Sequence, residues 1–368
     1  MTGPFSPRIR ALASISPFTG PETLERQHGR AFQARLGANE SVFGPSPKAI
    51  DAMARAAETS WMYGDPEQFA LREALASKLG ISRDCVVCGV GIDGLLRDLV
   101  AAACDPGSTV LASLGAYPTF GYFAVAAGAA VETVPYTPDY RQDLPALAAR
   151  ANELGPRILY LTNPDNPTGS WASADEVEAL VLKVPENTLI VLDEAYCEFA
   201  PARATLPAHY LRPNFVRLRT FSKAYGMAGV RVGYAFGDPN AIAQIHKVRD
   251  HFSLSRIAQA GALAALSDAD HLAFTIDAVE KGRSLLGKVA ERFGFRALPS
   301  ATNFVAMDLG RGEEHCRALA EDIAKQGVFV RRPGAPFLNR TLRVSVGTPQ
   351  DVECFEAALS KAVEAIDG

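Results

Sequence analysis

The stretch that decides both fold and chemistry is Thr220-Phe221-Ser222-Lys223-Ala224-Tyr225-Gly226-Met227-Ala228-Gly229-Val230-Arg231. Apolar, strand-like runs flank it on both sides. A lysine in a Gly- and Ala-lined turn between two core strands is unusual, because an ammonium group is costly to bury. A desolvated lysine loses its proton more readily and can attack an aldehyde. Arg231 could then grip a phosphate on that aldehyde. A surface loop with two charges is the alternative, and the local sequence alone leaves both interpretations open.

The composition is ordinary for a soluble enzyme, with 48% hydrophobic and 21% charged residues. A chain of 368 residues can bury a large core and is expected to form two domains. The net charge of −4 gives no general reason to bind nucleic acid. No apolar run is long enough to span a bilayer, and the start of the chain lacks the apolar core of a signal peptide. We therefore expect a cytoplasmic protein with neither nucleic-acid nor membrane partners.

The six cysteines and six histidines show no metal-ligand pattern. Cys85 and Cys88 have the C-x-x-C spacing but lie in a strand-like run, without the second cysteine pair or nearby histidine of a zinc site. His246 and His251 are one residue away from sharing a helical face. The sequence therefore predicts two buried free thiols and no metal.

The order of segments predicts an α/β fold. Seven short, apolar, non-alternating runs are typical of strands in a sheet covered on both faces. Helical segments at about 93–103, 118–126, 173–183 and 239–249 alternate with them, which favours a mostly parallel seven-stranded sheet. Ahead of the sheet, Ser46 and Pro47 predict the N-cap and first residue of a helix that ends near 58, and a second helix ends near 79. The predicted strands are 86–88, 109–112, 131–134, 158–161, 189–192, 215–218 and 232–236.

The pattern changes from about residue 253. Long helical segments at 254–267, 270–293, 313–325 and 350–366 enclose strand candidates only around 304–307, 329–331 and 341–346. This predicts a smaller α+β domain. The first 35 residues contain several prolines and no sustained period, which indicates an arm. The expected division is an N-terminal arm at 1–35, a large domain at 36–250 and a small domain at 251–368, which the arm joins.

Gly89-Val90-Gly91-Ile92-Asp93-Gly94 follows a predicted strand and precedes a helix. It matches the G-x-G-x-x-G pattern, but the acid that should bind a ribose about 20 residues further on is missing. The hypothesis of nicotinamide-dependent oxidation is weakened accordingly. The backbone N–H groups of Gly91, Ile92 and Asp93 at a helix N-terminus can still hold a phosphate.

Polar residues follow three further predicted strands. Asn166 lies in the segment after 158–161, Asp193 and Tyr196 come after 189–192, and Lys223 with Arg231 comes after 215–218. Each group alone could be a turn or a solvated acid. Ligands in such sheets bind at the carboxyl ends of the strands. We therefore expect one crevice where the acid can pair with a protonated ring nitrogen.

Together these motifs resemble the fold-type I pyridoxal-phosphate enzymes of the class I/II aminotransferases, and among them the histidinol-phosphate aminotransferase family. The resemblance implies this fold, transferase activity and pyridoxal 5′-phosphate as cofactor. It spans about residues 36–347, and the motifs are Asn39-Glu40, Gly44-Pro45-Ser46-Pro47, Tyr63, the segment 163–169, Asp193 to Tyr196, Ser222-Lys223 with Arg231, and Leu342-Arg343-Val344.

The resemblance implies a role for each matched residue. Lys223 would hold the cofactor covalently and later shuttle the substrate proton. Asp193 would keep the pyridine nitrogen protonated, which makes the ring an electron sink. Tyr196 and Asn166 would hydrogen-bond the phenolic oxygen of the ring. The groups that would grip the phosphate are Arg231, Ser222 and the backbone at Gly91, Ile92 and Asp93.

Other implied roles have simpler alternatives. Phe120 would stack on the cofactor ring, although it could be a core residue. Tyr63 would reach the phosphate of a neighbouring subunit, which implies a homodimer with shared sites, although it could be an ordinary turn aromatic. Arg343 would bind the substrate α-carboxylate as a bidentate pair, although an exposed arginine is unremarkable in its alternating stretch.

The resemblance also implies substrate contacts from Arg331, Asn39 and Phe18. Arg331 stands where the histidinol-phosphate branch has an arginine for the substrate phosphate. The chain departs from that branch at Phe18, where tyrosine is usual, at Gly94, where an acid is usual, and at His251-Phe252-Ser253, which replaces Pro-Phe-Asn. An aromatic amino acid aminotransferase is therefore an alternative.

Two further hypotheses share parts of this pattern. A lyase that resembles threonine-phosphate decarboxylase has most of the same motifs and also needs an arginine for a phosphate. A regulator with an aminotransferase-like domain would carry a DNA-binding region ahead of the fold. The residues before 36 have no helix-turn-helix pattern and no basic excess, which disfavours the regulator.

Overall fold

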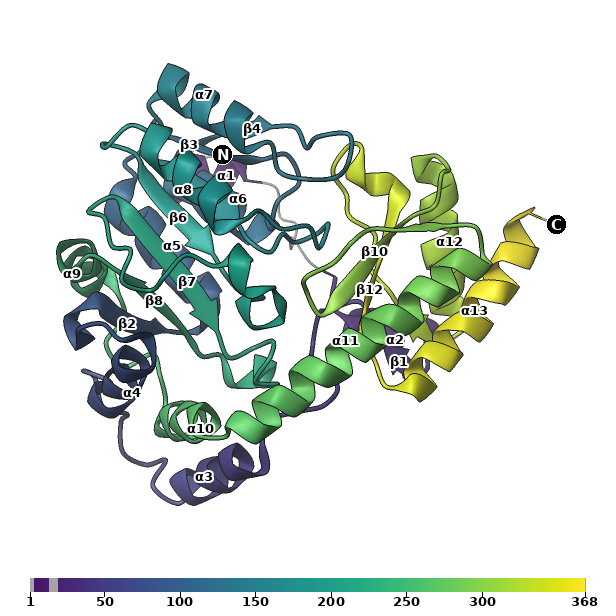
Figure 1. Cartoon of the computed structure of the whole chain (residues 1–368), viewed down its shortest axis with the longest axis horizontal. Coiled ribbons are helices and arrows are strands. Elements are labelled where there is room, and N and C mark those ends of the chain that lie inside the picture. Colours follow the sequence, from purple (N-terminus) through teal and green to yellow (C-terminus); the bar gives the residue numbers. More distant parts are fainter. Residues whose placement is uncertain (1–2, 13–18, 368) are drawn as a thin grey trace.

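A seven-stranded sheet in the order β2-β8-β7-β6-β5-β3-β4 forms the centre of the computed structural model, which describes residues 3–12 and 19–367 (Figure 1). β8 runs antiparallel to β2 and β7, and the other neighbours are parallel. The predicted α/β class and mostly parallel sheet are confirmed. The strands are Val86–Gly89 (β2), Thr109–Ser113 (β3), Ala130–Val134 (β4), Ile158–Thr162 (β5), Leu189–Asp193 (β6), Phe215–Thr220 (β7) and Gly233–Gly237 (β8).

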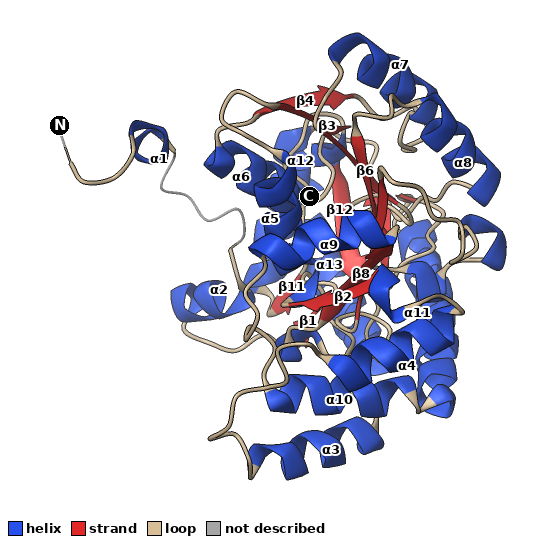
Figure 2. Ribbon diagram, turned by 90° about the vertical axis from the view of Figure 1, so that its left-hand side faces the viewer, coloured by secondary structure: helices blue, strands red, loops and turns tan. Residues whose placement is uncertain are grey.

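Helices cover both faces of this sheet (Figure 2). Helices α5 (Gly91–Ala103), α6 (Pro118–Ala127) and α9 (Pro239–Val248) pack on one face, where one apolar cluster joins them to the strands. Helices α7 (Leu144–Leu154) and α8 (Ala174–Lys183) pack on the other. Every residue of β5 is buried, which explains why the strand shows no alternation. Helix α7 was not predicted, although Asp143 caps it by accepting a hydrogen bond from Ala146 N.

The two helices predicted ahead of the sheet are present as α3 (Pro47–Ala57) and α4 (Phe69–Leu79). Ser46 is the N-cap of α3, and its hydroxyl oxygen accepts from Ala49 N at 3.1 Å. Helix α10 (Arg256–Leu266) packs against both α3 and α4. The thiols of Cys85 and Cys88 are buried and free, as predicted. Within the described residues, no helix is both long and apolar enough to cross a membrane.

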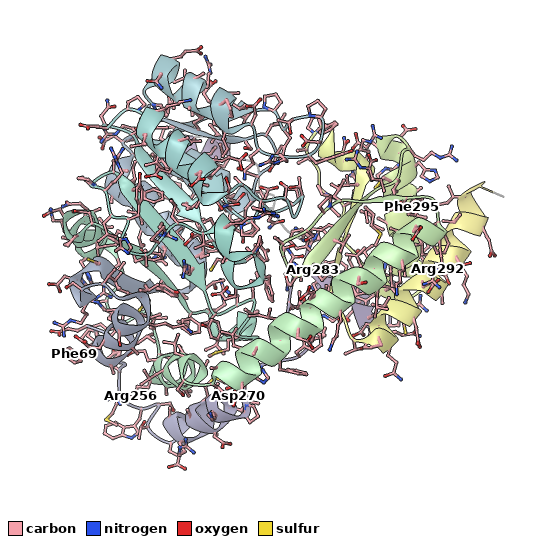
Figure 3. All side chains as sticks on the ribbon, in the orientation of Figure 1. Phe69, Arg256, Asp270, Arg283, Arg292 and Phe295 are labelled. Carbon is pink, nitrogen blue, oxygen red and sulfur yellow. The ribbon has the colours of Figure 1, made fainter. Side chains whose placement is uncertain are left out.

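The C-terminal part contains an antiparallel sheet in the order β12-β10-β9, formed by Thr341–Ser345, Phe304–Asp308 and Arg296–Ala297. Helices α12 (Glu313–Lys325) and α13 (Pro349–Asp367) pack on it. The long helix α11 (Ala269–Arg292) runs from the neighbourhood of α10 to α13 (Figure 3). Arg283, midway along it, donates to Thr302 O at 3.3 Å, and Arg292 pairs with Glu356 of α13 at 2.7 Å.

Residues 21–35 lie beside the C-terminal part, whereas the first helix of the chain lies near the large sheet (Figure 1). Strand β1 (Ala34–Arg35) pairs in parallel with β11 (Val328–Phe329). Among the described residues ahead of β1, helices are present at Pro7–Ala11 (α1) and Pro21–His28 (α2). Residues that follow β1 therefore enter the space between the two sheets. Single 3₁₀ turns complete the structure at Arg83–Cys85 (η1), Cys197–Phe199 (η2), Ala202–Ala204 (η3), Ala228–Val230 (η4) and Leu338–Arg340 (η5).

Candidate active site

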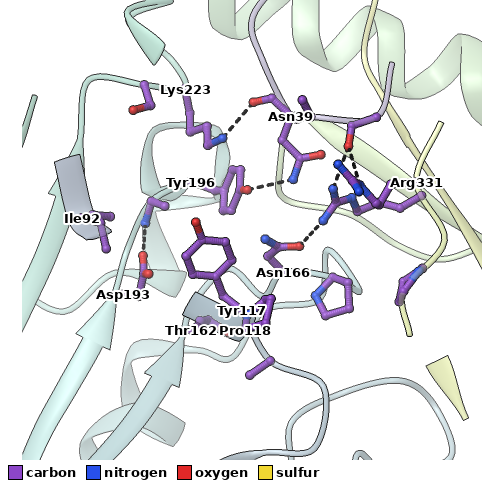
Figure 4. A pocket seen from close by; sticks show the side chains of 18 of the residues that line it. Asn39, Ile92, Tyr117, Pro118, Thr162, Asn166, Asp193, Tyr196, Lys223 and Arg331 are labelled. Atoms are coloured by element: carbon purple, nitrogen blue, oxygen red, sulfur yellow. Dashed lines mark hydrogen bonds between the residues drawn. The ribbon is translucent and has the colours of Figure 1, made fainter. Parts of the chain in front are cut away.

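A cavity of about 730 Å³ lies at the carboxyl ends of β5, β6 and β7 (Figure 4). The parallel strands bring their terminal residues to the same edge, as the sequence predicted. The C-terminal part closes the opposite wall. The predicted residues that line the cavity are Asn39, Ile92, Asp93, Asn166, Asp193, Tyr196, Ser222, Lys223, Arg231, Arg331 and Arg343.

Lys223 lies in the turn after β7 and extends its amine into the cavity. Nζ donates to the backbone oxygen of Asn39 at 3.0 Å. Burial, with the positive charges of Arg343 and Arg231, lowers the pKa of the Lys223 amine to about 8. An uncharged amine is therefore accessible near neutral pH, which is the state needed for attack on a carbonyl group.

Asp193 ends β6 and is only 5% exposed. Its Oδ1 accepts from Ala195 N at 3.0 Å, and its Oδ2 accepts from the Tyr160 hydroxyl at 2.7 Å. Burial raises the pKa of the Asp193 carboxyl to about 6. A cationic ligand atom against this carboxylate would lower that pKa again, so the side chain can hold a protonated nitrogen in the cavity.

A cradle for an anion forms where the N-terminus of α5 meets Arg231. Gly91, the first residue of α5, has φ +68, and a Cβ there would lie 2.5 Å from Arg231 Nη2. Arg231 donates to Ser222 Oγ at 3.3 Å and pairs with Asp93 Oδ2 at 3.2 Å. A helix N-terminus, a hydroxyl and a guanidinium group on one side of the cavity are typical of a phosphate site.

Tyr196 and Asn166 face the middle of the cavity (Figure 4). The Tyr196 hydroxyl accepts from Asn39 Nδ2 at 3.0 Å, and burial raises the pKa of this phenol to about 12. Tyr196 therefore keeps its proton at neutral pH. The amide oxygen of Asn166 accepts from Arg343 Nη1 at 2.6 Å, so its nitrogen is the atom that can donate to a ligand.

Two arginines from the C-terminal part form the opposite wall. Arg331 and Arg343 exchange backbone hydrogen bonds, and both guanidinium groups donate to Gly37 O, at 3.4 and 3.0 Å. Arg331 also donates to Thr19 O at 3.2 Å. Burial lowers the pKa of the Arg343 guanidinium to about 10, although the group remains charged at neutral pH. The pair therefore presents positive charge to an anionic substrate.

Two predicted residues lie elsewhere. Phe120 is 1% exposed and stacks on Tyr160 in the core with ring centroids 4.6 Å apart, so its predicted stacking on a ligand ring does not match its position. Besides Tyr196, the aromatic side chain in the lining is Tyr117, three residues before Phe120 and just before the first residue of α6. Tyr63 is 78% exposed and lies outside the cavity lining, beside Phe252. Phe18 lies outside the described residues.

Sequence reasoning missed several residues that shape the site. Tyr160, Tyr117 and Ser345 contact the predicted residues, and Arg332 lines the cavity. In the sequence, Tyr160 is one residue of an apolar run that predicts a strand. Only its hydrogen bond to Asp193 in the structure shows that its hydroxyl belongs to the site. The one available signal was Tyr117, an aromatic residue directly before Pro118 at a predicted helix start.

A lysine, an acid and an anion cradle at the strand ends of this fold define an aminotransferase site. The chain belongs to the class I and II aminotransferases, because the model of that family matches residues 33–359.

Particular relatives are similar over nearly the whole chain. Histidinol-phosphate aminotransferase 2 of Carboxydothermus hydrogenoformans is 34% identical, covering 92% of this chain and 94% of the relative. An aromatic amino acid aminotransferase of Nocardia farcinica is 38% identical, covering 87% and 89%. The crystal structure of histidinol-phosphate aminotransferase from Sinorhizobium meliloti in complex with pyridoxal-5′-phosphate is 44% identical, with a TM-score of 0.96 and 99% of each chain covered.

Proposed function

We propose that the chain is a pyridoxal 5′-phosphate-dependent aminotransferase that moves an amino group between histidinol phosphate, or an aromatic amino acid, and a 2-oxo acid such as 2-oxoglutarate. The observation that carries this proposal is the single cavity shared by Lys223, Asp193 and Arg231. The named relatives include both substrate classes, which makes an aromatic amino acid aminotransferase the second candidate.

The residues present fit the cofactor. A Cβ at Gly91 would collide with the Arg231 guanidinium group. Because Gly91 has none, this group can lie against the start of α5, where both can contact the same phosphate. Asp193 is a buried acid whose raised pKa calls for a cationic partner, which a pyridinium nitrogen supplies. Lys223 has a lowered pKa and can bond to the aldehyde.

Bound pyridoxal phosphate supplies an electron sink for the negative charge that develops at the substrate carbon next to the amine. Asp193 would hold a proton on the ring nitrogen and so strengthen this sink. Lys223 Nζ would take the proton from the substrate carbon. Tyr196 and Asn166 would donate to the phenolic oxygen, while Arg231, Ser222 and the backbone at Gly91, Ile92 and Asp93 would hold the phosphate. Tyr117, rather than Phe120, would cover the ring.

Arg343 and Arg331 would select the substrate. Arg343 would bind a carboxylate through its guanidinium group, since it lies within hydrogen-bond reach of Asn166. Arg331 lies further along the same wall and would bind the phosphate of histidinol phosphate. The amide of Asn39 is engaged by protein atoms, so we assign it to positioning rather than to direct contact with substrate.

We propose that two chains form a cytoplasmic homodimer with shared sites. Tyr63 and the neighbouring Trp61 are 78% and 81% exposed, which suits residues that enter a partner's site. The division into an arm at 1–35, a large domain at 36–250 and a small domain at 251–368 also stays a proposal. The pairing of β1 with β11 supports an arm that joins the small domain.

The proposal is tested by single-turnover amino transfer, followed through the cofactor absorbance with histidinol phosphate, phenylalanine, tyrosine and glutamate. Arg331→Met should lower kcat/KM for histidinol phosphate by about 100-fold and spare phenylalanine, because a charged hydrogen-bonded pair is worth about 1.5–3 kcal/mol. Arg317→Met, on the exposed face of α12, is the control.

Other outcomes would redirect the assignment. Equal losses with phosphorylated and unphosphorylated donors would remove the case for Arg331 as a phosphate ligand and favour the aromatic enzyme. Release of carbon dioxide without any requirement for a 2-oxo acid would identify a decarboxylase. Retention of the lysine-bound absorbance in Lys223→Ala would contradict the proposed function itself.

A further inference from the structure

Five hydrogen bonds with four side chains meet at Asn39. The residue is 2% exposed and has φ 54, a conformation that asparagine and aspartate tolerate better than most residues. Its backbone oxygen accepts from Lys223 Nζ at 3.0 Å and from Asn303 Nδ2 at 3.1 Å. Its side chain lies between Tyr196 and Ser345 of β12. Asn39 thus links Tyr196, in the turn after β6, with the amine of Lys223 and, through Ser345, with the C-terminal sheet.

The directions of these bonds are determined by Ser345. Its Oγ accepts from Asn39 N at 2.9 Å, and its hydroxyl hydrogen is donated to Asn39 Oδ1 at 3.1 Å. The amide oxygen of Asn39 therefore faces Ser345, and the amide nitrogen faces Tyr196 at 3.0 Å (Figure 4). An amide nitrogen can only donate, so the Tyr196 oxygen is the acceptor of this bond. The hydrogen of the Tyr196 hydroxyl must point to another acceptor.

We propose that Asn39 is a positioning residue that, together with Ser345, makes Tyr196 a donor toward the cavity, where its acceptor is the phenolic oxygen of the cofactor. This inference rests on the proposed function and deepens it. Asn39 acts through Tyr196, and the C-terminal sheet, through Ser345, sets the direction of a hydrogen bond at the cofactor.

The surroundings of Tyr196 keep its proton in place. The charged groups that face it are Arg343 of β12, Asp193 at the end of β6, Asp165 after β5 and the amine of Lys223, 5.7 Å from its ring centre. Tyr117 is a further titratable neighbour. Burial outweighs the opposing influences of Arg343 and the Asn39 amide, and the pKa of Tyr196 rises to about 12. The phenol is therefore a proton donor throughout the working pH range.

The test replaces the donor by an acceptor of the same shape. Asn39→Asp keeps the backbone conformation, and the new carboxylate turns the Tyr196 hydrogen away from the cavity. Dissociation constants are measured for pyridoxal phosphate and for its 3-deoxy analogue, which lacks the phenolic oxygen. We expect the preference for pyridoxal phosphate over the analogue to fall about tenfold, the value of a hydrogen bond to a charged group. The added carboxylate also repels the phenolic oxygen directly, and the Tyr196→Phe background measures that contribution separately.

The absorbance of the bound cofactor provides a second readout. A donor on the phenolic oxygen draws away the negative charge that helps Lys223 Nζ keep its proton. Without that donor the proton is retained to higher pH, so the spectral titration midpoint of Asn39→Asp should rise by about one unit. Tyr196→Phe should show the same loss of preference. In the Tyr196→Phe background, Asn39→Asp should change the ratio much less, because only the direct repulsion by the new carboxylate remains.

Controls separate this role from a structural one. Asn240→Asp introduces the same charge at an exposed position of α9 and should leave the ratio unchanged. Ser345→Ala frees the Asn39 amide to turn over and should lower the ratio by about threefold, which keeps the inference testable if Asn39→Asp does not fold. An unchanged ratio in the folded Asn39→Asp variant, or in Ser345→Ala, would overturn it, as would an undiminished effect in the Tyr196→Phe background. A wild-type chain that binds neither ligand would overturn the proposed function as well.

Discussion

The hydroxyl of Tyr160 donates to Asp193 Oδ2 at 2.7 Å, and both side chains are buried. Tyr160 lies in β5 and Asp193 at the end of the adjacent β6, so strand pairing brings the donor to the acid. Phe120 stacks on the Tyr160 ring and fixes its position. Phe120, which was expected to cover the cofactor, therefore supports from within the core the acid that we propose to hold the cofactor nitrogen.

Tyr160→Phe should make the ionised form of Asp193 less stable. Loss of a donor to the ionised carboxylate raises its pKa further above its ordinary range, so the acid limb of the pH–rate profile should move to higher pH. We expect amino transfer near pH 6 to fall about tenfold, which corresponds to one hydrogen bond to a charged group. The profile of kcat/KM from pH 5 to 9 measures this. Tyr122→Phe, at a half-exposed position of α6, is the control, and an identical acid limb in both variants would contradict the assignment.

Gly91→Ala should damage the anion cradle more than it damages the fold. The new Cβ would lie 2.5 Å from Arg231 Nη2 and push the guanidinium group away. Gly80→Ala is a matched control, because Gly80 has the same φ of +68 and a Cβ there meets nothing within 4 Å. We expect at least about tenfold weaker binding of pyridoxal phosphate for Gly91→Ala alone, measured by fluorescence titration. Equal losses in both variants would show that only backbone strain is at work.

Asp193→Asn should stabilise the cofactor-free protein. The folded-state pKa of Asp193, about 6, exceeds the ordinary value of 3.8, so the folded state binds this proton more tightly than the unfolded state. Stability is therefore lost as pH rises from about 4 to 6, by an amount on the order of 3 kcal/mol that persists above pH 6.

Urea unfolding of the cofactor-free protein at pH 4, 5.5 and 7.5 measures this difference. The gain for Asp193→Asn should be small at pH 4 and largest at pH 7.5. Asp51→Asn, an exposed substitution on α3, controls for the loss of one negative charge. A gain that does not grow with pH would mean that the burial of the carboxylate is not its cause.

Arg217→Met should destabilise the region behind Asp193. Arg217 pairs with Glu194 at 2.7 Å, and both side chains are at most 2% exposed. Arg219 also donates to Glu194, at 2.9 Å. Removal of Arg217 leaves a buried carboxylate with one ionic partner, which typically costs about 3–5 kcal/mol.

The measurement is again urea unfolding, with Arg83→Met as the control, because its ion pair with Glu73 lies at the surface and should matter little. The double variant Arg217→Met, Glu194→Leu should recover part of the loss, since the fully buried carboxylate is gone and the charge that loses its partner, Arg219, is 15% exposed. A double variant less stable than Arg217→Met would show that packing, rather than charge, dominates.

The strands and the strand-end chemistry could be predicted because they depend on local pattern. The run 158–161 is apolar without alternation, and the structure has a strand at Ile158–Thr162 that is buried throughout. Strand ends in a parallel sheet share an edge, so Asn166, Asp193 and Lys223 were expected together. The helix at Leu144–Leu154 was missed although its buried residues Leu144, Leu147, Ala148 and Ala151 have the spacing of an apolar helix face.

Contacts between individual side chains could not be predicted in this way. Tyr117 and Phe120 lie at the start of the same helix, and which of them faces the cavity depends on how α6 is rotated about its axis. A strand buried on both faces likewise gives no signal of which face Tyr160 occupies. The bonds between Asn39 and Ser345 join residues 306 positions apart, and no local pattern connects them.

The sequence by itself determined the sheet, the order of its strands along the chain and the set of reactive groups at their ends. The reason is that burial and turn formation act over a few neighbouring residues. Only the tertiary structure decided the rotation of α6, the support of Asp193 by Tyr160 and the direction of the hydrogen bond at Tyr196. These features depend on how separate elements pack and on which hydrogen-bond donors then meet which acceptors. Both are settled only when distant parts of the chain come into contact.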